Sequence, residues 1–114
     1  MDSQTRNASD VIERHWQVRD MLSPEAVPGE LRSALGSVLN GLESGALRVA
    51  EPGESGWTVH QWIKKAVLLY FRTNPSVPMA AAPANFFDKV PLRFSGTDDA
   101  DFRSVGARIV PGAI

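Results

Sequence analysis

Mostly apolar side chains recur with helical spacing near the N-terminus. They lie at i, i+4, i+7 and i+11, where the residues are Val11, His15, Val18 and Leu22. This spacing predicts an amphipathic helix that begins at Asp10, because Asp10 and Glu13 have the spacing of a capping box. Ser23-Pro24 ends this helix, since proline disfavours a helical conformation in the residue before it. The polar residues 1–9 are predicted to form a flexible lead-in.

A second apolar stripe predicts a helix from Glu30 to Ser44. The stripe consists of Leu31, Leu35, Val38, Leu39 and Leu42. Its period is that of a helix with one buried face. Gly45 stands where a glycine commonly ends a helix. Gly36 and Gly41 weaken the helix interior, and we interpret them as the mark of a close approach between helices.

The next pattern changes from helical spacing to alternation. Apolar and polar side chains alternate at 47–49 and again at 57–59, and the residues between these segments are rich in glycine, proline and glutamate. Two alternating segments around such a turn predict a β-hairpin. Two strands alone are marginally stable, so the hairpin is expected to pack on the helices.

A third helix is predicted from His60 to Arg72. Its side chains are apolar on almost all sides, and only Gln61, Lys64 and Lys65 interrupt them near its start. A helix with this pattern lies at the centre of a fold or meets a partner subunit. Asn74-Pro75 ends it.

The remaining residues predict little regular structure. Residues 73–85 are rich in proline and alanine and read as a loop, and residues 86–94 read as extended chain because Pro91 excludes a helix interior. Thr97 is predicted to cap a short helix that ends before Gly106. The sequence thus predicts a mainly α fold: a small helical domain of three main helices and a short one, with a short β-hairpin and an extended C-terminal segment.

Composition narrows the class of protein. The 114 residues fit one domain, and hydrophobic residues make up 43%, which suffices for a core. The net charge of −1 argues against nucleic acid as the main partner, because phosphate neutralisation needs a basic surface. There is no cysteine, which excludes disulfides and thiolate chemistry. The polar N-terminus and the short apolar runs indicate no membrane segment, and a cytoplasmic location is expected.

The sequence offers few candidates for catalysis or metal binding. His15 and His60 lie far apart without a second ligand at metal spacing, and we assign both to structural roles. The cluster Asp98-Asp99-Ala100-Asp101 admits a metal site, but acidic residues also favour a helix N-terminus, which is the preferred interpretation. Lys64 and Lys65 beside Trp62 suggest either contact with an anion or a solvated lysine pair over a buried tryptophan. No catalytic, cofactor-binding or metal-binding residue is assigned.

Arg108 differs from these charged residues because it lies in a short apolar segment, between Ala107 and Ile109-Val110. The planar guanidinium suits bidentate capture of a carboxylate. The pattern alone fits equally well a strand residue that faces solvent.

Four strings are distinctive together: SGALRVAE at 44–51, HQWIKKAVLL at 60–69, FDKVPL at 87–92 and GARIVP at 106–111. In this order and spacing they closely resemble the N-terminal region of the tetrahydrodipicolinate N-succinyltransferase family. The resemblance covers about residues 8–112. It departs from the family pattern at Gly112, at 95–97 and in the proline- and alanine-rich loop.

The resemblance implies a role for each part of the chain. Residues 10–106 would be a helical, substrate-side domain, and residues 107–114 would lead toward a left-handed β-helix domain. Family members work as trimers in lysine and diaminopimelate biosynthesis, bind succinyl-CoA along the β-helix and carry their acid/base carboxylates there. By its match to the family motif, Arg108 would contact the cyclic dicarboxylate substrate. The partners implied are this substrate, a β-helix acyltransferase domain or subunit, and two further copies.

Two hypotheses follow from the sequence. In the first, the chain is the substrate-side domain of a succinyl-CoA-dependent N-acyltransferase and is inactive alone. In the second, it is a free-standing, non-catalytic binding or assembly module derived from that domain. Hexapeptide repeats in the DNA after the codon for Ile114 would favour the first.

Overall fold

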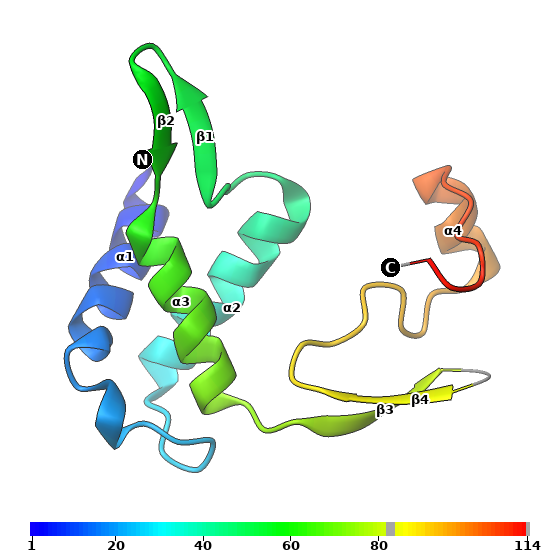
Figure 1. Ribbon diagram of the computed structural model, residues 1–114, viewed down its shortest axis with the longest axis horizontal. Helices are drawn as coiled ribbons and strands as arrows, with labels where there is room; N and C mark the ends of the chain where they lie inside the picture. Colours follow the sequence, from blue (N-terminus) through cyan, green and yellow to red (C-terminus); the bar gives the residue numbers. More distant parts are fainter. Residues whose placement is uncertain (82–83, 114) are drawn as a thin grey trace. The chain divides into compact units, whose positions relative to one another are not determined.

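The computed structural model describes residues 1–81 and 84–113. The chain divides into two compact units, Met1–Ser76 and Val77–Ile114. The sequence had suggested a single domain over residues 10–106. The first unit contains α1 (Ser3–Trp16), the short 3-10 helix η1 (Arg19–Met21), α2 (Gly29–Ser44), β1 (Ala50–Gly53), β2 (Gly56–Val59) and α3 (Gln61–Thr73). In Figure 1 the three α-helices pack together and the β1–β2 hairpin extends beyond them. The mainly α fold class is confirmed.

The core of the first unit forms where the three helices meet. The largest fully buried apolar side chains come from all of them: Ile12 on α1, Leu31 and Val38 on α2, and Ile63 and Leu69 on α3. Trp62 and Leu69 are buried, whereas Val67 and Leu39 are only half-buried. Leu39 belongs to the predicted stripe of α2, so the stripe marks the buried face of that helix but not its exact limits.

The first helix begins earlier than predicted. It starts at Ser3 and not at Asp10, and the predicted flexible lead-in over residues 1–9 is wrong for this segment. Asp2 caps the helix, since its Oδ1 accepts a hydrogen bond from the backbone N–H of Thr5 at 2.7 Å. Ala8 turns inward and is buried in the core. The first two turns look featureless in sequence because their other side chains are polar and mostly exposed.

The same helix also ends earlier than predicted, at Trp16 and not near Leu22. The chain continues through the 3-10 turn of η1, and the Arg19 side chain donates a hydrogen bond to the Trp16 carbonyl at 2.8 Å. Leu22 still reaches the core, although it follows a different path from a helix. A stripe with helical spacing can therefore continue past the helix when the turn after it returns to the core.

The second helix is confirmed, and the three glycines singled out in its sequence, Gly36, Gly41 and Gly45, have different surroundings. Gly45 ends α2 in the left-handed conformation with φ of 83°. Gly41 lies under Leu47, because a Cβ built there would come within 2.6 Å of the Leu47 side chain. A Cβ added at Gly36 would meet nothing within 4 Å among the described residues. The glycines were predicted to mark a close approach between helices. Instead, Gly41 makes room for the segment that follows the helix.

A pair of alanine substitutions separates these roles. Gly45→Ala should destabilise the protein by about 1–2 kcal/mol, because an alanine is strained in the left-handed region. Gly36→Ala should stabilise it by about 0.5–1 kcal/mol, because alanine is the better helix former and nothing opposes its methyl group. Urea unfolding of both variants measures the two changes. Equal changes of the same sign would contradict the assigned backbone conformations.

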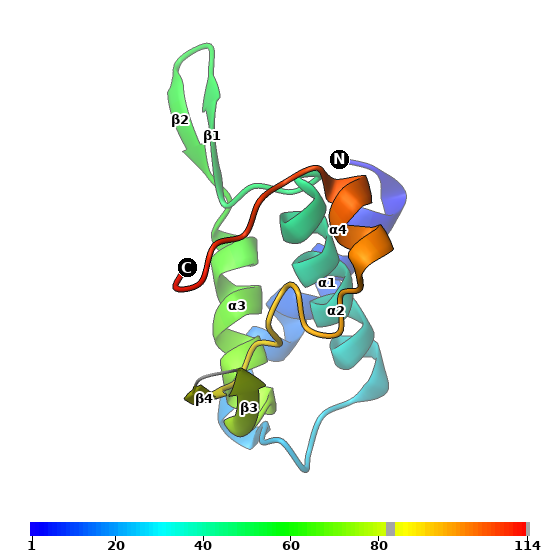
Figure 2. The same cartoon turned by 90° about the vertical axis from the view of Figure 1, so that its right-hand side faces the viewer.

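The predicted β-hairpin is present, and its second strand lies where it was expected, but its first strand lies further along the chain. Its first strand begins at Ala50 and not at Leu47, and Leu47 packs against the core instead. The strands pair in the register Ala50↔Val59, Glu51↔Thr58, Pro52↔Trp57 and Gly53↔Gly56. Figure 2 shows from a second side that the hairpin extends away from the helices. Leu47 and Val49, at the base of the hairpin, pack against the helical core, whereas Trp57 and Val59 on its strands are exposed, contrary to the expectation that the hairpin would lie on the helices.

The third helix begins and ends within one residue of its prediction. It contacts both α1 and α2 and so closes the bundle. Its buried side chains are Trp62, Ile63, Ala66, Leu69 and Thr73. Leu68 and Phe71 point away from this face and are exposed. The apolar sequence therefore covers more of the helix surface than the first unit buries.

The second unit contains a strand pair that was not predicted. β3 (Val77–Ala81) and β4 (Ala84–Asp88) are antiparallel, with Pro78 opposite Phe87. The prediction of a loop over 73–85 is therefore wrong for β3, and residues 82 and 83 lie outside the described residues. A two-stranded ribbon has only edge strands, which tolerate a proline that cannot donate a hydrogen bond. The predicted extended stretch 86–94 holds for β4 and then gives way to turns.

The short helix was predicted correctly except for its cap. α4 (Asp99–Val105) is capped by Asp98 and not by Thr97, and Gly106 follows it in the left-handed conformation. The rings of Phe94 and Phe102 lie 5.6 Å apart and hold the preceding turn against this helix. Residues 107–110 have no regular structure, and a turn follows at 110–113, where Ala113 N–H donates to the Val110 carbonyl.

Candidate functional site

Arg108, the substrate-binding residue expected from the sequence, lies just after α4 in the second unit. It is exposed, and no hydrogen bond or ion pair joins its guanidinium to another described residue. The left-handed Gly106 redirects the chain after the helix, and Arg108 lies in the segment 107–110, which has neither helix nor strand. An exposed guanidinium can clasp a carboxylate through two parallel hydrogen bonds.

The acidic cluster near Arg108 belongs to the start of α4. Asp98 Oδ1 accepts from the backbone N–H of Asp101 at 2.8 Å, and Arg103 Nε donates to Asp99 Oδ2 at 2.7 Å. These contacts confirm the interpretation as a helix N-terminus, where negative charge is favourable. Over residues 1–81 and 84–113, no group of three or more histidine, cysteine, aspartate or glutamate side chains is placed to hold a metal ion.

The two histidines lie on different elements, and each has a partner of its own. His15 is buried, and its Nδ1 donates to the Val11 carbonyl at 2.9 Å, while its Nε2 lies 3.5 Å from Glu30. His60 Nε2 lies 3.2 Å from Glu51 at the base of the hairpin. Both contacts support the structural roles inferred from the sequence.

The two lysines of α3 differ in their surroundings. Lys65 donates to Glu13 at 2.7 Å, which links α3 to α1, and its Nζ lies 6.0 Å from the Trp16 ring. Lys64 is exposed, and Trp62 is buried beside it. Lys64 fits the interpretation as a solvated lysine near a buried tryptophan, whereas Lys65 does not, because it is half-buried and paired with Glu13. The basic string therefore contributes mainly to helix packing in the first unit.

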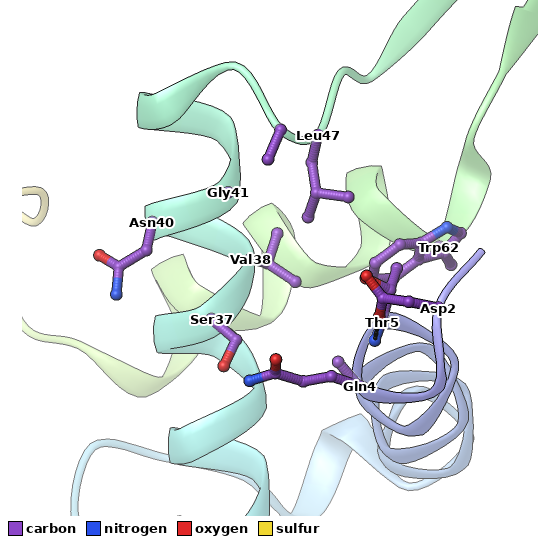
Figure 3. A pocket seen from close by; sticks show the side chains of 11 residues that line it. Asp2, Gln4, Thr5, Ser37, Val38, Asn40, Gly41, Leu47 and Trp62 are labelled. Atoms are coloured by element: carbon purple, nitrogen blue, oxygen red, sulfur yellow. Dashed lines mark hydrogen bonds between the residues drawn. The ribbon is translucent and has the colours of Figure 1, made fainter.

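A cavity of about 310 Å³ in the first unit was not predicted. It lies where the start of α1 meets α2 and the segment before β1 (Figure 3). Gln4 and Ser37 face each other across it, and Trp62 and Leu47 form its apolar side. No sequence signal pointed to this cavity, because one of its walls is the helical start that had been interpreted as a lead-in.

Charge in this cavity is negative. Hydrogen bonding from the Thr5 backbone N–H lowers the pKa of Asp2 below its ordinary value. The helix cap is therefore strongest while Asp2 is ionised, and it weakens as the pH falls through the lowered pKa. The described lining residues include no lysine or arginine. The cavity can hydrogen-bond a small polar molecule, but it does not suit a dicarboxylate.

Comparison with known proteins gives consistent results. The family model described as "Tetrahydrodipicolinate N-succinyltransferase N-terminal" matches residues 7–73. Three similar proteins are each named 2,3,4,5-tetrahydropyridine-2,6-dicarboxylate N-succinyltransferase. The one from Delftia acidovorans is 46% identical over 96% of this chain and 40% of its own length. Those from Burkholderia multivorans and Xylella fastidiosa are 48% and 51% identical, over 91% and 82% of this chain and 38% and 34% of their own lengths.

These matches extend beyond the first unit. A match over 96% of the chain leaves too few residues outside it to exclude Arg108. The chain spans about two-fifths of the length of these relatives, between 34% and 40% for the three named above. Among the described residues, no helix has both the length and the apolar character needed to cross a bilayer.

Proposed function

Because the chain belongs to the tetrahydrodipicolinate N-succinyltransferase N-terminal family, we propose that it is the substrate-side domain of a succinyl-CoA-dependent N-succinyltransferase. The observation that carries this proposal is the match of the family model to residues 7–73, which are nearly the whole of the first unit. The relatives support it further, because the match to the Delftia acidovorans relative covers 96% of this chain and so continues into the second unit. The proposed substrate is tetrahydrodipicolinate, and the proposed pathway is lysine and diaminopimelate biosynthesis.

The proposed reaction is an acyl transfer. The amine formed from the hydrated ring attacks the thioester carbonyl of succinyl-CoA, a C–N bond forms and the C–S bond breaks. The amine loses a proton to a base in the β-helix domain, and coenzyme A leaves as the thiol. In this scheme Arg108 holds one substrate carboxylate and thereby orients the amine for attack.

The proposed assembly follows from the same scheme. The chain would work with a β-helix acyltransferase domain that binds succinyl-CoA, in a cytoplasmic homotrimer whose active sites lie between neighbouring subunits. Three observations support a substrate-side role. Arg108 is exposed, the first unit is a helical domain with its own core, and the chain matches an N-terminal family domain. Arg108 lies outside the part of the chain that the family model covers, so its role needs a direct test.

A chimeric enzyme provides the test. This chain replaces the corresponding N-terminal region of the Xylella fastidiosa relative, and thiol release from succinyl-CoA is followed with tetrahydrodipicolinate as acceptor. We expect the chimera to be active and both separated parts to be inactive, because neither part holds the complete site. Acceptor-dependent thiol release by this chain alone would contradict the proposal. A folded, trimeric but inactive chimera would favour the non-catalytic module instead.

A further inference from the structure

The β1–β2 hairpin has one apolar face and one polar face. Residues directly opposite each other in an antiparallel pair point to the same side, so the pairs Ala50↔Val59 and Pro52↔Trp57 share a face. The pair between them, Glu51↔Thr58, lies on the other face, where Glu51 contacts His60. We name the first set, Ala50, Pro52, Trp57 and Val59, the apolar hairpin face.

This face is not covered within the first unit. Trp57 is 70% exposed and Val59 is 47% exposed. The hairpin extends beyond the helices in both views (Figures 1 and 2). Two strands alone are marginally stable in water, and an exposed tryptophan is among the residues most enriched where proteins meet. Amphipathic strands with their apolar side in solvent indicate a surface that another part of a protein covers.

We propose that the apolar hairpin face docks on the acyltransferase part of the same polypeptide in the intact enzyme, with Trp57 as its anchor. This inference rests on the proposed function. The relatives are more than twice as long as the region they share with this chain, so the larger part of each relative lies outside that region and can cover the face. The hairpin then holds the helical unit against the acyltransferase part.

The size of the face favours a covalently linked occupant over a second copy. Burying a tryptophan removes about 150–250 Å² from solvent, and the other three side chains are smaller. The whole face thus falls short of the roughly 800 Å² per partner that a specific complex of separate chains needs. A linked partner needs less contact area, because linkage gives a high effective concentration, on the order of millimolar for a short flexible linker.

Fluorine NMR of the chimera tests the docking. The isolated chain and the chimera are labelled with 5-fluorotryptophan, and Trp57→Phe identifies the Trp57 resonance. In the isolated chain this resonance should show the large H₂O–D₂O shift of an exposed indole. In the chimera the shift should fall to about the value of the buried Trp62. An unchanged shift in the chimera would overturn the proposal.

A substitution tests whether the contact matters. Trp57→Ser in the chimera should raise the rate of proteolysis between the two parts roughly tenfold, as expected on loss of a central interface tryptophan. Thr58→Ser, on the opposite face, is the matched control and should leave the rate unchanged. Trp57→Ser should not change the melting temperature of the isolated chain, because Trp57 is exposed there. Equal rates for both chimera variants would contradict an anchoring role.

The remaining outcomes assign other occupants or separate the two proposals. A Trp57 resonance already protected in the isolated monomer would assign the face to the second unit, and protection together with dimerisation in sedimentation would assign it to a second copy. Either result overturns the inference. If that chimera is insoluble, the labelled chain is fused instead to the C-terminal part of the Burkholderia multivorans relative, and unchanged exposure of Trp57 in this second fusion then overturns it. A protected Trp57 in an inactive chimera would overturn the proposed function alone, and an exposed Trp57 in an active chimera would overturn the docking alone.

Discussion

Leu69→Ala should lower the free energy of unfolding by about 2–5 kcal/mol. Leu69 lies on α3 in the centre of the helical core and is 0% exposed. Truncation removes its buried methyl groups and leaves a cavity between helices that can only partly close. Domains are typically stable by about 5–15 kcal/mol, so this single change removes a large share of the total. Urea unfolding followed by far-UV circular dichroism measures the loss.

Leu68 supplies the matched control, because it has the same side chain on the same helix but is 52% exposed. Leu68→Ala should change the stability of the isolated chain by no more than about 0.5 kcal/mol. The difference between the two variants isolates the effect of burial, since helix propensity changes equally in both. A loss below about 0.5 kcal/mol for Leu69→Ala would show that α3 does not pack as the structure describes.

The elements predicted best from the sequence are those in which the apolar stripe and the residues that end the element agree. α2 and α3 each combine an apolar stripe with a residue that ends the helix, Gly45 in one case and Asn74-Pro75 in the other. The hairpin was found from its turn, because glycine at Gly53 and Gly56 allows a tight reversal between alternating segments. Its first strand was placed too early, since Leu47 fits the alternation of a strand but packs on the helical core.

The start of α1 shows what a periodicity search misses. Residues 3–9 present only one apolar side chain, Ala8, to the core, so the sequence of this segment shows no apolar stripe. The capping residue Asp2 was visible, but Asp10 with Glu13 offered a more conspicuous capping pattern. The cavity next to α1 was missed for the same reason. A polar segment can thus be helical when neighbouring elements supply most of the apolar contacts.

The second unit was harder to predict, because its local signals conflict. Pro78 argues against a strand, yet β3 forms because its ribbon has no central strand. Arg108 could be singled out from its apolar surroundings, but composition and spacing alone left a surface role equally open. Its assignment to the substrate depends on the family resemblance, which supplies a role that geometry within this chain does not.

Arg108→Lys in the chimera should reduce kcat/KM by roughly 30-fold or more with an almost unchanged melting temperature. Lysine keeps the positive charge but loses the planar fork that grips a carboxylate with two hydrogen bonds. Losing such a partly desolvated contact typically costs about 2–5 kcal/mol. Stability should not change, because Arg108 is exposed and joined to no other described residue by a hydrogen bond or ion pair. Steady-state kinetics on tetrahydrodipicolinate, run beside a thermal melt, measure both quantities.

Arg103 provides the matched control for this substitution. It lies on α4 close to Arg108 in sequence and pairs with Asp99 at 2.7 Å on an exposed surface. Such exposed pairs contribute little to stability, so Arg103→Lys should leave both kcat/KM and the melting temperature nearly unchanged. A loss confined to Arg108→Lys assigns the substrate contact to that guanidinium. If kcat/KM is the same for both variants, or if Arg108→Lys lowers the melting temperature by several degrees, Arg108 is a surface or structural residue and the carboxylate is held elsewhere.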